Sequence, residues 1–186
     1  MKSTATYAIY YDAEFTSIDD LSKAGLISAG FVSEKDDRQF YAELLDTWEP
    51  VMCSFFVLDT VLPLLEDGEQ AVMKGRQMKV AEFARQLKTW IESFDGQVVL
   101  KSDAPSADFP FLVKIFDVHG WPFNLRRKCS FVWFDRQDQQ FRYQQALADF
   151  WKTHGKQQHH ALIDARSMQY ASKFAIRRGM NDGYRR

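Results

Sequence analysis

The feature that most constrains the fold is an uncharged run, residues 5–11, that leads directly into the sequence Asp12-Ala13-Glu14. Every residue of this run is apolar, aromatic or β-branched, which is typical of a central strand. Alternate side chains of a strand share a face, so Asp12 and Glu14 would lie side by side at its end. Unpaired carboxylates are costly to bury, so the pattern indicates that another group neutralises them.

The composition is typical of one globular domain. The chain has 186 residues, 46% of them hydrophobic and 15% aromatic, which excludes a disordered protein. We expect this domain to cover residues 1–180 and a flexible tail to cover 181–186. Because the net charge is -1, any nucleic acid must be held by local basic patches.

The sequence also predicts a cytoplasmic location. No apolar run approaches the roughly 18 residues of a membrane span, and the first residues lack a secretory signal pattern. Cys53 and Cys129 are far apart and have no nearby Cys or His partners, so we expect two reduced thiols rather than a zinc site.

Hydrophobic periodicity predicts an α/β fold with a mixed five-stranded sheet flanked by helices. The first three strands would form an antiparallel meander. A long helix before the fourth strand favours parallel pairing of the later strands. The strands after residues 5–11 are expected over 26–32, 39–45, 96–102 and 130–134, and the helices over 79–94, 107–116, 139–154 and 159–178.

Two more acids fall on helix faces that should be buried. Asp164 shares a stripe with small and apolar residues at helical spacing, and Asp108 aligns in the same way with Phe111, Leu112 and Ile115. Taken singly, Asp108 and Asp164 are also explained as first-turn acids that the helix dipole favours. The pair Asp12 and Glu14 is also explained by a strand whose end emerges into water. Jointly, four inward carboxylates indicate a shared site.

Four gathered carboxylates would raise one another's pKa unless cations shared the site. Oxygen ligands favour Mg²⁺ or Mn²⁺ over zinc, and two such ions about 3.5–4 Å apart are suited to phosphodiester cleavage. We therefore predict Asp12, Glu14, Asp108 and Asp164 as metal ligands and catalytic acids. His159 precedes Asp164 by five residues and could act as a general base. Its neighbour His160 is expected to face solvent or the helix surface.

The ordered set Asp12-Ala13-Glu14, then Asp108, then His159 and Asp164 resembles the three motifs of the DEDDh 3'-5' exonucleases. The segments DAEF, LISAGFV, VLPLL and HHALIDAR are most similar to the small bacterial exoribonucleases of the ribonuclease AS type. This resemblance implies a ribonuclease H-like fold and a single-stranded RNA or DNA 3' end as the partner. It also implies a possible homodimer.

The same resemblance implies roles for individual residues. Asp12 would bridge two divalent ions, Mg²⁺ or Mn²⁺, Glu14 and Asp164 would complete their coordination, Asp108 would hold one ion, and His159 would be the general base. Asp103 is the alternative ligand in the second motif, where many relatives have an asparagine.

Substrate contacts are expected from Phe15 and Thr16, which follow the first motif. In similar enzymes an apolar side chain there packs against the terminal bases and the neighbouring backbone holds the 3'-hydroxyl. Core packing is the alternative for Phe15. The basic sequences Arg126-Arg127-Lys128 and Arg177-Arg178 are candidates for phosphate contacts.

The sequence thus predicts a metal-dependent 3'-5' exonuclease, with RNA preferred, that releases 5'-mononucleotides. One alternative is a DNA exonuclease for proofreading or repair trimming. The other is a module that binds nucleic acid without cleaving it, against which the complete set of acids and histidine argues.

Overall fold

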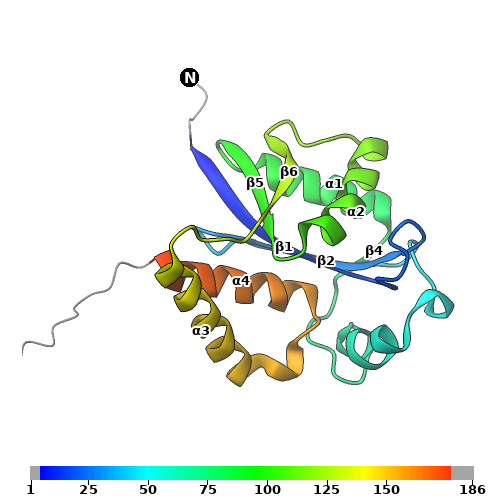
Figure 1. Ribbon diagram of the computed structural model, residues 1–186. Helices are drawn as coiled ribbons and strands as arrows, with labels where there is room; N and C mark the ends of the chain where they lie inside the picture. Colours follow the sequence, from blue (N-terminus) through cyan, green and yellow to red (C-terminus); the bar gives the residue numbers. More distant parts are fainter. Residues whose placement is uncertain (1–4, 177–186) are drawn as a thin grey trace, which may run out of the picture.

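The computed structural model describes residues 5–176, and its centre is a six-stranded mixed sheet with the order β4-β3-β2-β1-β5-β6 (Figure 1). β1 pairs antiparallel with β2 and β2 with β3, whereas β5 and β6 continue parallel to β1. The predicted change from antiparallel to parallel strands is therefore confirmed. The strands are β1 Thr6–Phe15, β2 Leu26–Ser33, β3 Gln39–Leu44, β4 Gln77–Met78, β5 Gln97–Ser102 and β6 Leu125–Phe131.

Helices cover both faces of this sheet. α1 and α2 pack on one face, and α4, backed by α3, packs on the other (Figure 1). Within the described part of the chain, no helix combines the length and the apolar character needed to cross a membrane. The helices are α1 Val80–Glu92, α2 Pro105–His119, α3 Gln137–His154 and α4 Ala161–Ile176, with short helical turns at Pro50–Met52, Val57–Val61, Leu62–Leu64 and Gly155–Gln157.

β1 is a central strand, as its uncharged sequence predicts. Ile9 and Tyr11 point into the core beneath α1 and α2, and Tyr10 packs against α3 and α4. The alternation of the strand places Asp12 and Glu14 on the side of Tyr10. Because the strand extends to Phe15, both carboxylates belong to the strand itself rather than to a loop after it.

The prediction of five strands was wrong in two respects. β4 has only two residues, which pair parallel with the end of β3 and are too few to give a periodic pattern. The last strand occupies Leu125–Phe131 instead of 130–134. Its basic residues lack apolar alternation, but an edge strand tolerates them because one side faces solvent.

Helix boundaries also differ from those predicted. α2 extends beyond the predicted range 107–116 at both ends, and it begins with Pro105, whose fixed φ suits the first helical position. Pro110 lies inside this helix without ending it. The sequence Arg177-Arg178 and the predicted tail over 181–186 lie outside the described residues. Cys53 and Cys129 are both free thiols, as expected.

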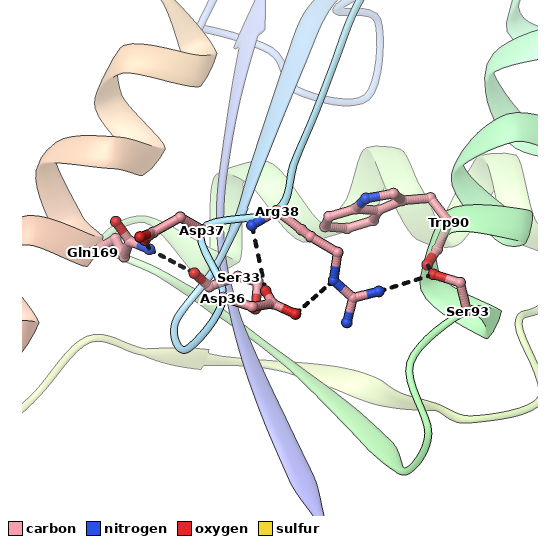
Figure 2. A network of polar contacts seen from close by, with 7 residues as sticks. All are labelled: Ser33, Asp36, Asp37, Arg38, Trp90, Ser93 and Gln169. Atoms are coloured by element: carbon pink, nitrogen blue, oxygen red, sulfur yellow. Dashed lines mark hydrogen bonds and ion pairs between the residues drawn. The ribbon is translucent and has the colours of Figure 1, made fainter.

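The turn between β2 and β3 connects the two helical layers (Figure 2). On one side, the Gln169 side chain of α4 donates hydrogen bonds to the carbonyl of Ser33 at 2.5 Å and to Asp37 at 2.6 Å. On the other side, Arg38 donates to Ser93 after α1 at 3.2 Å. These contacts fix α4 at the end of the sheet opposite to Asp12 and Glu14.

α4 also approaches β2 very closely at Gly30. A Cβ atom at this position would lie 2.4 Å from the backbone of both Ala161 and Leu162. Gly30 is the partner of Asp12 in the register of β1 and β2. The missing side chain therefore lets the first turn of α4, which carries Asp164, lie directly over the acidic end of β1.

We expect Gly30→Ala to destabilise the protein by about 1–3 kcal/mol, the usual cost of overpacking a core. The added methyl group meets backbone atoms, which cannot rotate away as a side chain can. Urea unfolding measures this change. Gly155→Ala is the matched control, since no atom of residues 5–176 lies within 4 Å of a Cβ there. Equal free energies of unfolding for the two variants would show that α4 does not depend on this close contact.

Candidate active site

Acidic side chains from several elements gather around one cavity of about 610 Å³. β1 contributes Asp12 and Glu14, the first turn of α2 contributes Asp108, and the first turn of α4 contributes Asp164. Asp103 lines the same cavity from the loop between β5 and α2. Since β1 and β5 are parallel, their carboxyl ends lie at the same edge of the sheet, which explains how segments distant in sequence meet here.

The first group of possible ligands contains Asp12, Asp103 and Asp108, each with a carboxylate oxygen within 4.8 Å of the others. Asp108 is only 2% exposed and accepts a short hydrogen bond from the hydroxyl of Ser102. That hydroxyl in turn accepts from the backbone N–H of Ala104 at 2.9 Å. The structure thus brings both Asp103 and Asp108 to Asp12, instead of selecting one of the two.

The second group contains Glu14, His159 and Asp164, again with potential ligand atoms within 4.8 Å of one another. The backbone N–H of His159 donates to Oδ2 of Asp164 at 3.1 Å. The other carboxylate oxygen of Asp164 is buried and has no hydrogen-bond partner among the described residues. A buried acceptor without a donor at the centre of an acidic cavity fits a cation ligand.

The backbone of His159 sets the direction of two consecutive imidazoles. Its φ of 69° is in the left-handed region, so the chain turns sharply before α4. The His159 ring lines the cavity and contacts Phe56 edge to face, with 4.8 Å between ring centroids. His160 was expected to face solvent or the helix surface, and that prediction was wrong. The ring is buried, with 1% exposed, and stacks on Tyr41 with 4.5 Å between ring centroids.

Burial lowers the pKa of both histidines. For His160 the pKa falls to about 4. Burial disfavours the charged imidazolium in each case, so His159 is neutral at neutral pH and can accept a proton.

Desolvation and mutual repulsion raise the pKa of the carboxyl groups in the cavity. Desolvation is the larger cause for Asp12 and Glu14, followed by the negative charges of Asp164 and Asp108. Desolvation raises the pKa of Asp108 to about 7 and that of Asp164 to about 8, although hydrogen bonds offset part of the effect. No Lys or Arg is among the described residues that line the cavity. Protons or external cations must therefore compensate the charge.

The two predicted substrate-binding residues have different environments. Phe15 is half-buried and stacks on Phe111 with 5.1 Å between ring centroids. It also lines the cavity, so its side chain both packs against the core and contacts the site. Thr16 is 1% exposed, and its hydroxyl accepts from the backbone N–H of Gly25 at 3.0 Å. Thr16 is not among the residues that line the cavity, and a substrate contact by its backbone stays a prediction.

Sequence reasoning missed the apolar wall of the cavity. Ile18 comes from an irregular segment, Phe56 from the start of the short helical segment that includes Val57–Val61, and Leu147 and Trp151 from α3. The spacing of Tyr143, Leu147 and Trp151 places them on one helical stripe, which is the signal that could have identified the two α3 residues. No comparable periodicity exists for Phe56, which is 53% exposed.

Sequence comparison gives no match: neither a protein-family model nor a curated protein is similar to the chain. Solved structures do share its fold. Escherichia coli exonuclease I, in a zinc-bound complex with single-stranded DNA, aligns over 92% of this chain and 40% of its own, with a TM-score of 0.54 and 13% identity. Exonuclease I from Methylocaldum szegediense aligns over 89% and 39%, with a TM-score of 0.50 and 16% identity.

A third structure is similar over most of its own length. Schizosaccharomyces pombe Pop2p, in a form with bound Mg²⁺ and Mn²⁺, aligns over 90% of this chain and 81% of its own, with a TM-score of 0.51 and 12% identity. The chain spans about 40% of the exonuclease I proteins that it resembles. Identities this low establish the fold alone, and the fold is the expected ribonuclease H-like one.

The raised pKa values predict how pH affects the metal-free protein. The folded carboxyls bind protons that the unfolded chain releases, so the cavity reduces stability progressively as the pH rises from about 4 to about 8. Asp12→Asn removes one charge and should raise Tm in EDTA at pH 8 by roughly 2–8 °C, which corresponds to about 1–2 kcal/mol. Thermal unfolding followed by circular dichroism measures the shift.

The same experiment tests cation binding. Mn²⁺ should raise the Tm of the unmodified protein more at pH 8 than at pH 5, because a carboxylate must lose its proton to bind a metal. Asp12→Asn should lose most of this response, whereas Asp135→Asn, which changes an exposed acid outside the cavity, should keep it. A lower Tm for Asp12→Asn in EDTA would contradict the repulsion that we infer.

Proposed function

We propose that the protein is a metal-dependent 3'-5' exonuclease that removes 5'-mononucleotides from single-stranded nucleic acid, with RNA preferred over DNA. The observation that carries this proposal is a cavity with two adjacent acidic groups and, among the residues that the structure describes, no Lys or Arg lining it. The fold shared with exonuclease I and Pop2p supports it. The preference for RNA rests on the sequence resemblance to exoribonucleases.

Two divalent ions, Mg²⁺ or Mn²⁺, fit the donor set because carboxylate oxygens are their preferred ligands. The unpartnered oxygen of Asp164 agrees with this assignment. Asp12, Asp108 and Asp103 would hold one ion, and Glu14 with Asp164 would hold the other. The sequence resemblance implies that Asp12 would also contribute to the second ion. When bound, the ions would neutralise phosphate charge and stabilise both the attacking and the leaving oxygen.

His159 is the general base in this proposal. Its neutral ring would take a proton from the attacking water as the water oxygen bonds to phosphorus. The bond between phosphorus and the 3'-oxygen of the preceding nucleotide breaks, which releases a 5'-mononucleotide and leaves a new 3'-hydroxyl. The hydrogen bond from the His159 backbone to Asp164 and the ring contact with Phe56 keep the imidazole beside the acids.

Phe15 and the apolar wall of the cavity would hold the terminal base. Phe15 and Trp151 line the cavity with the acids, and a base stacked on an aromatic ring gains about 1–3 kcal/mol. Such stacking tolerates any base, so we expect little sequence preference from this wall. A DNA exonuclease is the second candidate function, because exonuclease I, whose fold this chain shares, has been solved with single-stranded DNA.

The test uses RNA and DNA oligomers of the same sequence, labelled at the 5' end and incubated with the protein and Mn²⁺. We expect a ladder of products shortened from the 3' end, with RNA degraded faster than DNA and no reaction in EDTA. Asp12→Ala should abolish shortening, and His159→Ala should slow it by roughly 10²–10⁴-fold. His119→Ala, at the exposed end of α2, is the matched control and should be fully active.

Each contrary outcome has a distinct meaning. Faster shortening of DNA would support the second candidate. Tight binding without shortening of any oligomer would overturn the enzymatic proposal in favour of a binding module. Shortening that persists in both Asp12→Ala and His159→Ala would show that this cavity is not the active site.

A further inference from the structure

The edge strand β6 exposes three consecutive cations through a bulge. Val98 of β5 pairs with Leu125, and Leu100 pairs with Cys129, so a single β5 residue lies opposite three residues of β6. Those three are Arg126, Arg127 and Lys128, and all are exposed. A bulge disrupts the ladder and redirects side chains, which explains how neighbouring residues can all point towards solvent.

The charge of this basic bulge is not compensated within the described residues. None of its three cations forms an ion pair there. Arg126 donates to the side-chain oxygen of Gln97 at 2.7 Å, and the guanidinium of Arg127 lies 4.9 Å from the centre of the Trp121 ring. Both partners are neutral, so the bulge remains a concentrated positive patch on a chain whose net charge is -1.

Exposed aromatic rings lie at the other end of the same strand. Phe131 is 54% exposed and Trp133 is 63% exposed, with 6.4 Å between their ring centroids. Phe131 pairs with Ser102 at the end of β5, whose carbonyl accepts from the backbone N–H of Val132 at 2.9 Å. Ser102 directly precedes Asp103, which lines the acidic cavity, so the pairing of Phe131 with Ser102 brings the end of β6 next to this side of the cavity.

We propose that β6 binds the part of a single-stranded nucleic acid that lies 5' to the nucleotide in the cavity. Bases would stack on Phe131 and Trp133, and phosphates would contact the basic bulge. This inference rests on the proposed function, because the cavity fixes where the 3' end lies. From Phe131 back to Arg126 the strand covers about 17 Å at ~3.3 Å per residue. That length matches about five stacked nucleotides at ~3.4 Å each, so a nucleic acid longer than this gains affinity for the protein.

Two features favour a single-stranded nucleic acid over another protein as the molecule that binds β6. The patch combines cations with exposed aromatic rings, as surfaces for single strands do. A second copy of the chain that paired through β6 would bring the same three cations against each other. Charged edge strands also discourage sheet-to-sheet aggregation, but that protection alone does not require aromatic rings at the cavity.

The experiment compares the affinity of a fluorescent 12-nucleotide RNA with that of a 3-nucleotide RNA by anisotropy. All proteins carry Asp164→Asn to prevent turnover. The test variant replaces Arg126, Arg127 and Lys128 with Gln. The control variant replaces Lys74, Arg76 and Lys79 with Gln, which removes the same charge from exposed positions beside β4, at the opposite edge of the sheet.

We expect the test variant to bind the 12-nucleotide RNA roughly 100-fold more weakly at 0.1 M salt, with the slope of log K against log salt reduced by about 2. The 3-nucleotide RNA, which cannot reach the bulge, should bind equally well to all three proteins. A separate variant, Trp133→Ala, should weaken the longer complex by about 5-fold or more without changing the salt slope, whereas Phe141→Ala on α3 should have no effect.

The proposal is overturned if the test and control triple variants bind the longer RNA equally, or if both RNA lengths are affected to the same degree. Absence of binding to the longer RNA by the parent protein overturns it as well. Shortening of the 3-nucleotide RNA by the protein without Asp164→Asn tests the proposed function separately. If the longer RNA binds through β6 but no RNA is shortened, the proposed exonuclease activity is contradicted and the proposed binding surface on β6 is supported.

Discussion

Repulsion among carboxylates in one cavity is the interaction on which the rest of this structure depends. Asp12 and Glu14 cannot move apart, because they lie two residues apart in β1, which pairs with β2 along this stretch. Asp108 and Asp164 approach them from two different helices. The raised pKa values of all four groups record the cost, which the packing of the whole domain must offset unless protons or cations reduce it.

The fold holds these acids in place mainly through backbone geometry. Gly30 lets α4 approach β2 until backbone atoms are nearly in contact, and this fixes Asp164 over β1. The hydroxyl of Ser102 orients Asp108, and the backbone N–H of His159 orients Asp164. Such constraints order the proposed ligand set before cations bind. Cation binding would therefore not carry the free-energy cost of ordering these side chains.

The sequence predicts the parts of the site that repeat with a secondary-structure period. An uncharged run identified β1, and helical stripes identified Asp108 and Asp164 as inward acids, because burial follows spacing in both cases. The direction of His160 was not predictable, since it depends on the left-handed φ of the residue before it. Phe56 lies at the start of a helical segment too short to give a periodic pattern, and its contact with His159 depends on tertiary folding.

The same reasoning explains why the edge of the sheet was harder to predict than its centre. A central strand must be apolar on both faces, whereas β6 has solvent on one side and tolerates three cations in sequence. Its bulge also breaks the two-residue alternation on which strand prediction relies. From sequence alone, the basic residues of β6 are therefore predicted to form a loop. That the strand continues is shown only by the pairing of Val98 with Leu125 on one side of them and of Leu100 with Cys129 on the other.

If the proposed function is correct, the arrangement of charge along the sheet would order two steps of substrate binding. β1, β5 and β6 are parallel neighbours, so the acids, the rim at Asp103 and the end of β6 follow one another across a single edge. A polyanion is attracted by the basic bulge and repelled by the acids as long as the acids lack cations. Without metal, β6 would retain a strand whose 3' end stays outside the cavity. In the proposed exonuclease, cation binding would reverse the charge balance at the acids alone, so metal would control entry of the 3' end while β6 would control retention of the nucleic acid.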